Sequence, residues 1–187
     1  MHGWMKAVVL SAGLAASGAF VGASLAAETG HHGPDGFSDI PYGSPLSEAM
    51  SRNHGNGQIA NDTLIYTTAI AGMTFSVTQN YDRNRRATDA NAVTTITEPP
   101  RGCVARFNYV LDLLQASYGP PSAPPLASKV PPPGGKGQTT AHYAVSFTFD
   151  RNDGIDVQLN APDPAGSDPG PCQISLHYLP PGWVGHF

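Results

Sequence analysis

The sequence predicts an α+β fold in which one amphipathic helix covers a small antiparallel sheet and one disulfide joins the two. The sheet is expected to combine an N-terminal hairpin with a C-terminal three-stranded meander. Two patterns predict these elements. β-branched and aromatic residues alternate with polar ones in residues 63–81 and in three stretches between residues 143 and 178, and apolar residues recur at helical spacing in residues 103–118. The third observation is that the chain has two cysteines, which usually pair in an exported domain.

The first 26 residues have the features of a secretory signal peptide. Lys6 supplies a positive charge, residues 7–21 carry none, and Ser24 and Ala26 place small side chains at the two positions that a signal peptidase reads. Glycine and serine dilute the apolar run, which makes a membrane anchor the weaker alternative. We therefore expect a periplasmic or secreted protein without a membrane span.

Residues 27–57 are expected to form a flexible, poorly ordered N-terminal arm ahead of a single domain at residues 58–187. The arm is rich in turn-forming residues and shows no apolar periodicity. One short helix is predicted at residues 45–52, with Ser44 as its N-cap and Pro45 at the first helical position.

The hairpin is predicted from residues 64–70 and 73–79, which turn at Ala71 and Gly72. Residues 91–97 are a further candidate strand. The meander is predicted from three later stretches, residues 143–149, 155–159 and 172–178, each with apolar side chains at alternate positions.

The helix is predicted at residues 103–118, where Cys103, Phe107, Val110 and Leu114 fall on one stripe. Gly119 suits the left-handed position after a helix, and two prolines prevent continuation. Because Cys103 lies on the stripe and Cys172 has the inward parity of its strand, we expect a bond between them to fasten helix to sheet.

A proline-rich loop is predicted at residues 119–140, in which residues 120–140 contain seven prolines and three glycines. Such a stretch can be neither a regular helix nor a central strand. Residues 129–133 are expected to favour the extended polyproline II conformation, which suits a partner-binding loop.

The stretch FTFDRNDGIDVQL, residues 147–159, crowds three aspartates around one glycine. It is not an EF-hand: with Asp150 at position 1, Gly154 falls at position 5 instead of 6, and Ala161 stands where a bidentate glutamate is required.

A hairpin turn is the favoured interpretation of the same stretch. If Phe149 and Val157 share the inner face, residues 152–154 form the loop and Asp150 lies opposite Asp156. A weak calcium site using Asp150, Asp153 and Asp156 is the alternative. Otherwise no cofactor is predicted.

An arginine cluster follows the first hairpin. Arg83, Arg85 and Arg86 stand close to Tyr81, and guanidinium groups suit carboxylate, sulfate or phosphate. These four residues are a candidate site for an anion or a protein partner, with a solvated loop as the alternative.

Metal and catalytic signatures are weak. His142 and His177 fall on outward strand positions and would be neighbours only if the third meander strand lay beside the first. The sequence contains no zinc-site histidine spacing, and neither a GxSxG nor a Walker motif. No residue is assigned a catalytic or metal-binding role.

The sequence is compatible with two functions. The favoured one is a non-catalytic binding or accessory protein, such as an inhibitor or an envelope-assembly factor, with a protein or glycan partner in the envelope or extracellular space. The alternative is a small metal-dependent hydrolase or cation-binding domain that uses the acidic hairpin and the outer-face histidines. A net charge of −4 gives no general attraction to nucleic acid.

Overall fold

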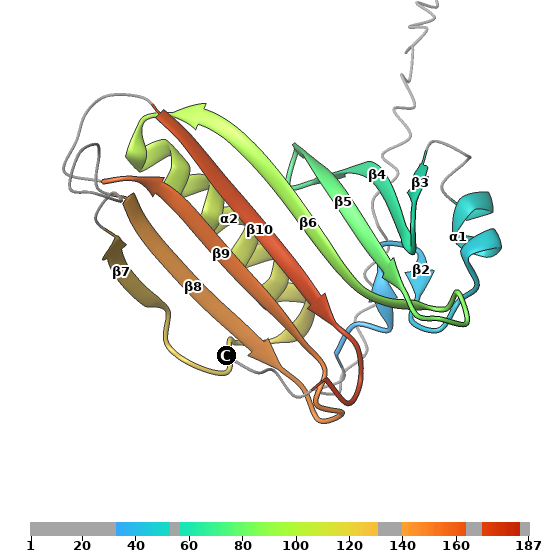
Figure 1. The fold of residues 1–187 in the computed structure, drawn as a ribbon. Coiled ribbons are helices and arrows are strands. Elements are labelled where there is room, and N and C mark those ends of the chain that lie inside the picture. The colour runs from blue at the N-terminus through green and yellow to red at the C-terminus, as the bar shows by residue number, and fades with distance from the viewer. Residues whose placement is uncertain (1–32, 53–56, 131–139, 164–169, 184–187) are drawn as a thin grey trace, which may run out of the picture.

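The computed structural model describes residues 33–52, 57–130, 140–163 and 170–183. They form one eight-stranded antiparallel sheet, one two-stranded sheet and two helices (Figure 1). The expected signal peptide lies outside the described residues. Within the described part of the chain, no helix is long and apolar enough to cross a membrane.

The elements follow one another along the chain as β1 (Gly36–Phe37), β2 (Ile40–Pro41), α1 (Leu46–Arg52), β3 (Gln58–Ala60), β4 (Thr63–Ile70), β5 (Met73–Tyr81), β6 (Ala87–Glu98), α2 (Pro100–Tyr118), β7 (Leu126–Val130), β8 (Thr140–Thr148), β9 (Gly154–Pro162) and β10 (Gly170–Leu179).

The large sheet has the strand order β3-β4-β5-β6-β10-β9-β8-β7. It contains the predicted hairpin, β4 with β5, and the predicted meander, β8 with β9 and β10. The hairpin turns at Ala71 and Gly72, whose φ values of +54° and +72° are those of a type I′ turn. The two predicted pieces are one sheet, because β6 pairs with β5 on one side and with β10 on the other. The candidate strand at residues 91–97 is the central part of β6.

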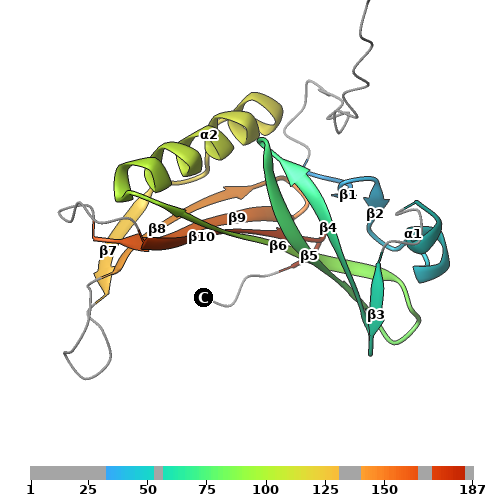
Figure 2. The ribbon, with the colours of Figure 1, turned by 90° about the horizontal axis from the view of Figure 1, so that it is seen from above.

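Helix α2 lies across one face of β6, β10 and β9 (Figure 2). The predicted stripe of Cys103, Phe107, Val110 and Leu114 is buried against the sheet. Burial of each large apolar side chain contributes about 1.5–3 kcal/mol. The helix ends as predicted at Gly119, whose φ is +84° and whose N–H bonds to the carbonyl of Gln115 at 2.9 Å.

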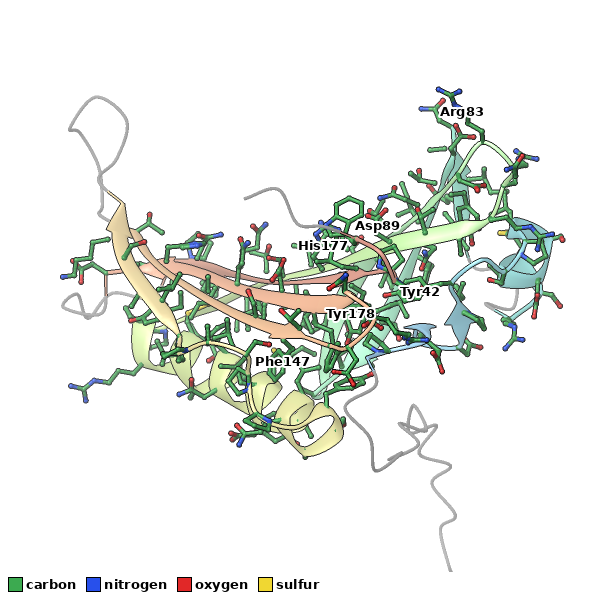
Figure 3. The ribbon with its side chains drawn as sticks, turned by 90° about the horizontal axis from the view of Figure 1, so that it is seen from below. Tyr42, Arg83, Asp89, Phe147, His177 and Tyr178 are labelled. Atoms are coloured by element: carbon green, nitrogen blue, oxygen red, sulfur yellow. A yellow bond between two sulfur atoms is a disulfide. The ribbon has the colours of Figure 1, made fainter. Side chains whose placement is uncertain are left out.

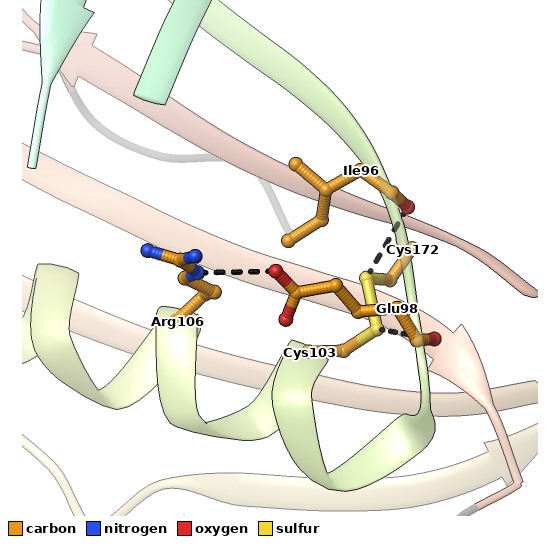
Figure 4. The surroundings of a disulfide bond; sticks show 5 residues. All are labelled: Ile96, Glu98, Cys103, Arg106 and Cys172. Atoms are coloured by element: carbon orange, nitrogen blue, oxygen red, sulfur yellow. Dashed lines mark hydrogen bonds and ion pairs between the residues drawn. A yellow bond between two sulfur atoms is a disulfide. The ribbon is translucent and has the colours of Figure 1, made fainter. Parts of the chain in front are cut away.

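The disulfide joins Cys103 of α2 to Cys172 of β10, as the sequence predicts (Figure 4). Both cysteines are fully buried. On the same helix, Arg106 forms an ion pair with Glu98, with its Nε 3.3 Å from Oε1 (Figure 4). The first turn of α2 is therefore fixed to the sheet both inside the core and at the surface.

The described part of the N-terminal segment packs into the core. Phe37, Ile40, Leu46 and Ala49 are buried in the same apolar cluster that α2 covers, and the Phe37 ring lies 4.7 Å from the Tyr178 ring. We expected this segment to be a poorly ordered arm. Its apolar residues are scattered singly among turn formers, so they produce no periodic signal although each one is buried.

The predicted short helix is present as α1. The Ser44 hydroxyl, the expected N-cap, is buried and has no hydrogen-bond partner among the described residues. The backbone fixes the start of α1 instead, since Pro45 bridges to Arg86 and the Leu46 N–H bonds to the Arg85 carbonyl at 3.1 Å.

Part of the proline-rich loop is a strand. Residues 126–130 form β7, an edge strand paired only with β8 in the described sheet. Lys129 and Val130, which we expected to favour polyproline II, belong to this strand. Residues 131–133 lie outside the described residues. Prolines bracket β7 but do not interrupt it, which is the arrangement that an edge strand tolerates.

Candidate functional site

A surface depression of about 440 Å³ lies where α1 meets the turn between β5 and β6. Polar and apolar side chains share its wall. It is lined by Pro45, Leu46, Ser47, Met50, Ile59, Asn84, Arg85 and Arg86. We call residues 82–86 the arginine loop, and the lined space the arginine-loop depression.

The arginine loop is closed by its own hydrogen bonds. One carboxylate oxygen of Asp82 accepts the backbone N–H groups of Asn84 and Arg86, each at 2.8 Å. The Asp82 N–H donates to the Arg86 carbonyl, and the Arg85 N–H donates to the Asp82 carbonyl, both at 2.9 Å. Arg85 has a φ of +58°, a left-handed conformation that is uncommon outside glycine. Strained residues of this kind persist where the surrounding structure fixes them and often lie at functional sites.

The loop is also bonded to the segment that leads into α1. The Ala87 N–H donates to the Ser44 carbonyl at 2.9 Å, and the Gly43 N–H donates to the Ala87 carbonyl at 2.7 Å. The Arg86 guanidinium donates to the Gly43 carbonyl at 3.1 Å. Both walls of the depression therefore belong to one hydrogen-bonded unit.

Arg83, Arg85 and Arg86 are all exposed. Figure 3 shows Arg83 at the tip of the turn, directed away from the molecule. Among the ion pairs of the described residues, none includes any of these three arginines. Their charge faces solvent without a neutralising carboxylate, which leaves the guanidinium groups available to an external anion.

Tyr81 does not belong to this site. Its side chain is buried in the core, and burial raises the pKa of Tyr81 to about 12. Alternation along β5 explains the separation, because Met73, Phe75, Val77 and Tyr81 all face the core.

The acidic hairpin has a different register from the one predicted. Ser146, not Asp150, pairs with Asp156, and the Phe149 N–H donates to the Asp153 carbonyl at 3.0 Å. Residues 150–152 therefore form the three-residue loop. Asn152 takes the left-handed position, with a φ of +55°, that we expected glycine to occupy. Asparagine tolerates this conformation, so the glycine was a misleading signal.

This register separates the three aspartates. Asp153 faces the core, where its fully buried carboxylate lies 3.0 Å from the Arg151 guanidinium, while Asp156 lies on the opposite face and accepts the Ser146 hydroxyl at 2.7 Å. Asp150 is exposed at the tip. The described residues contain no group of three or more His, Cys, Asp or Glu side chains arranged to hold a metal ion. The structure does not bring the proposed calcium ligands together.

Asp153 is the buried member of a polar cluster. Arg151 also pairs with Asp35 at 2.9 Å, which fixes the N-terminal segment to the hairpin. The second Asp153 oxygen and the Tyr42 hydroxyl are buried without a hydrogen-bond partner among the described residues. Burial, and next the charge of Asp153, raises the pKa of Tyr42 far above its ordinary value. We assign this cluster a structural role.

The two outer-face histidines are not neighbours. His142 of β8 contacts Asn160, with Nδ1 and Oδ1 2.8 Å apart, and β9 separates it from His177 of β10. The Nε2 of His177 lies 3.1 Å from the carboxylate of Asp89. His31, His32, His54 and His186 lie outside the described residues.

The apolar part of the depression was not predicted from the sequence. Leu46 and Met50 come from the segment expected to be a poorly ordered arm, and Ile59 comes from β3. Ile59 is half exposed, at 50%. The predicted helix at residues 45–52 was the available signal, because it places Leu46 and Met50 one turn apart.

The arginine-loop depression combines guanidinium groups, a side-chain amide and a hydroxyl with a methionine and an isoleucine. Such a surface can bind a carboxylate or another oxyanion that carries an apolar neighbour. Comparisons of the chain with protein-family models, with curated proteins and with solved structures gave no significant match.

Proposed function

We propose that the chain is a secreted or periplasmic non-catalytic binding protein that uses the arginine-loop depression to dock an acidic, apolar-flanked segment of a protein partner. The observation that carries the proposal is the arginine loop itself. It presents the exposed side chains of Arg85 and Arg86 at the depression, and that of Arg83 at its tip, on a turn that is internally hydrogen bonded and fixed to α1. A preorganised turn loses little conformational entropy on binding.

The charge distribution supports an acidic partner. The chain has ten lysines and arginines and a net charge of −4, yet three of those basic residues lie within four consecutive positions. The arginine loop is thus a local positive region on an acidic molecule, and it would steer an acidic segment toward itself.

The shape of the depression supports a peptide segment in place of an enclosed small molecule. The space is open to solvent, and Ile59 remains half exposed at its rim. Apolar surface next to a charged rim is the usual arrangement at a protein interface, where a buried side chain supplies affinity and the charges supply orientation.

The alternative of a cation-dependent hydrolase is not proposed. It would need the hairpin aspartates or the outer-face histidines to converge, and their side chains occupy different faces or different strands.

The test is fluorescence anisotropy with two dye-labelled peptides, one of alternating leucine and glutamate and one with every glutamate replaced by glutamine. The variant R83A/R85A removes two of the guanidinium groups, and R101A/R106A is the matched control because both arginines are exposed on α2. Loss of charge-assisted contacts should weaken binding of the glutamate peptide at least tenfold, or about 1.4 kcal/mol, in R83A/R85A only.

Binding to the wild-type protein should also weaken as salt rises, because the guanidinium groups are exposed. The proposal fails if the wild-type protein binds neither peptide. It also fails if both peptides bind equally, or if the two variants behave alike.

A further inference from the structure

The sheet face opposite α2 carries a row of hydrogen-bonding side chains. Residues directly opposite one another in a sheet share a face, so the strand register places five of them side by side across five adjacent strands. The row consists of Thr78 in β5, Asn91 in β6, His177 in β10, Asp156 in β9 and Ser146 in β8. Figure 3 shows His177 and Asp89 on this face, on the side of the sheet away from α2 and Phe147. Adjacent members lie on strands about 4.8 Å apart, which makes a regular ladder of polar groups.

The described outward positions on the central strands of this face carry no lysine or arginine. Outward positions of β5, β6, β8, β9 and β10 carry serine, threonine, asparagine, glutamine, histidine and aspartate, together with Val93, Leu179 and small residues. None of these described positions carries lysine, arginine or glutamate. Its two aspartates already accept hydrogen bonds: Asp156 is buried and accepts from Ser146, and Asp89 accepts from Asn80. The face therefore suits a neutral ligand.

Trp183 is positioned beside this row by a tight turn. The Trp183 N–H donates to the Pro180 carbonyl at 3.1 Å, and Gly182 between them has a φ of +80°. A type II turn requires a positive φ at its third position, which glycine adopts readily, and proline is common at its second. The Gly182 N–H also donates to the Arg151 carbonyl at 3.0 Å, which fixes the turn to the β8–β9 hairpin. The turn brings the Trp183 ring centroid to 6.2 Å from that of His177, and Trp183 remains 44% exposed.

Asp89 fixes the orientation of His177. One of its carboxylate oxygens lies 3.1 Å from His177 Nε2 and accepts the Asn80 amide at 2.8 Å, while the other accepts the Thr88 hydroxyl at 3.1 Å. An imidazole held by a carboxylate keeps a defined ring plane. The aromatic platform and the polar row are therefore both preorganised.

We propose that Trp183 and the row from Thr78 to Ser146 bind a neutral glycan. Sugar hydroxyls are donors and acceptors at once, which matches amide, hydroxyl and imidazole groups. The C–H bonds on the flat side of a sugar ring carry a partial positive charge, which is attracted to the negative face of an indole. The absence of lysine and arginine from the described positions of the face disfavours an anionic glycan or a phosphate. This glycan site is separate from the arginine-loop depression.

The test uses tryptophan fluorescence. The chain has two tryptophans, Trp4 and Trp183, so W4F makes Trp183 the sole reporter in the full chain. The probes are cellohexaose, hexa-N-acetylchitohexaose and maltohexaose, which differ in linkage and substituents but are all neutral. At least one should change the emission of Trp183 in a saturable manner.

The variant N91A, made in the same W4F background, removes an exposed amide next to His177. It should weaken binding of the oligosaccharide about tenfold, the effect of losing one or two hydrogen bonds. W183A should abolish binding of the oligosaccharide, as measured by calorimetry because this variant lacks the fluorescent reporter. The matched control R83A/R85A should bind the sugar as the wild-type protein does. Sugar binding therefore tests this inference separately from the peptide binding of the arginine loop.

Three results would overturn the inference. The first is that none of the three oligosaccharides gives a saturable response. The second is that N91A and W183A bind the sugar as tightly as the wild-type protein. The third is a wild-type dimer in sedimentation that W183A converts to a monomer, since the face would then be an interface between copies of the chain.

Discussion

The Asp82 carboxylate holds Arg86 in place by accepting its backbone N–H at 2.8 Å. The same oxygen accepts the N–H of Asn84 at the same distance. No guanidinium is involved in either bond. The conformation of the arginine loop thus depends on a residue that need not touch a ligand.

We predict that D82A lowers the free energy of unfolding by about 1 kcal/mol, the usual effect of removing a side-chain acceptor from exposed backbone N–H groups. It should also weaken binding of the glutamate peptide although all three arginines remain. D82N is the matched control, because its amide oxygen can still accept. Urea unfolding and peptide anisotropy measure the two effects. Unchanged peptide binding by a folded D82A protein would show that the loop needs no preorganisation.

Reduction of the disulfide should lower stability substantially. Cys103 and Cys172 are 69 residues apart, and the chain-entropy model assigns about 4 kcal/mol to closing a loop of that length. Denaturant midpoints with and without reductant measure the difference. The variant C103A/C172A is the control, since its midpoint should not respond to reductant. An equal midpoint for the oxidised and reduced wild-type protein would contradict the prediction.

Asp89 should make stability fall in acid. Burial by itself would raise the pKa of Asp89, but hydrogen bonds from His177, Asn80 and Thr88 outweigh it and hold the pKa at about 2, below the ordinary 3.8. Because the pKa of Asp89 is lower in the folded than in the unfolded protein, the ionised carboxylate stabilises the fold. The contribution, about 2 kcal/mol, should be complete above pH 4 and disappear as the pH falls toward 2. Urea unfolding across this range should show a steeper loss for the wild-type protein than for D89N. Parallel pH profiles would exclude this role.

Arg151 and Asp153 should be energetically coupled. The Asp153 carboxylate is fully buried, and Arg151 is its counter-charge at 3.0 Å. R151A should therefore destabilise by about 3 kcal/mol, because it leaves a buried charge unpaired. The double variant R151A/D153A should lose less than the sum of the two single variants, with a coupling of at least about 1 kcal/mol. Additive losses in a urea double-mutant cycle would show that the two residues act independently.

The sequence predicted the elements whose pattern follows from a single periodicity. The stripe of α2 and the alternation in β8, β9 and β10 each report a buried face directly. Parity also predicted the disulfide, because Cys103 and Cys172 both fall on inward positions. These predictions needed no information on how distant segments pair.

The sequence did not predict what depends on long-range pairing. Alternation in β6 does not reveal that it lies between β5 and β10, so the single eight-stranded sheet was missed. Phe37 and Ile40 gave no periodic signal because they occur in segments of two residues. The hairpin register was shifted, since Gly154 suggested a left-handed position that Asn152 occupies.

The candidate site was predicted only in part, because some of its residues also come together through long-range packing. Arg83, Arg85 and Arg86 are adjacent in sequence, so their cluster was visible. Met50 and Ile59 line the depression beside Arg85 and Arg86 only through tertiary packing. Trp183 reaches His177 through a turn that the sequence LPPGW encodes, but the position of the ring follows from the sheet order.

The most direct test of the arginine-loop depression is a two-dimensional NMR titration with N-acetyl-leucine and its neutral amide. We predict that the acid shifts the backbone resonances of Ser47, Asn84 and Arg85, and that the amide has little effect, because a guanidinium recognises a carboxylate. Equal shifts with both compounds, or shifts confined to residues outside the depression, would contradict the account.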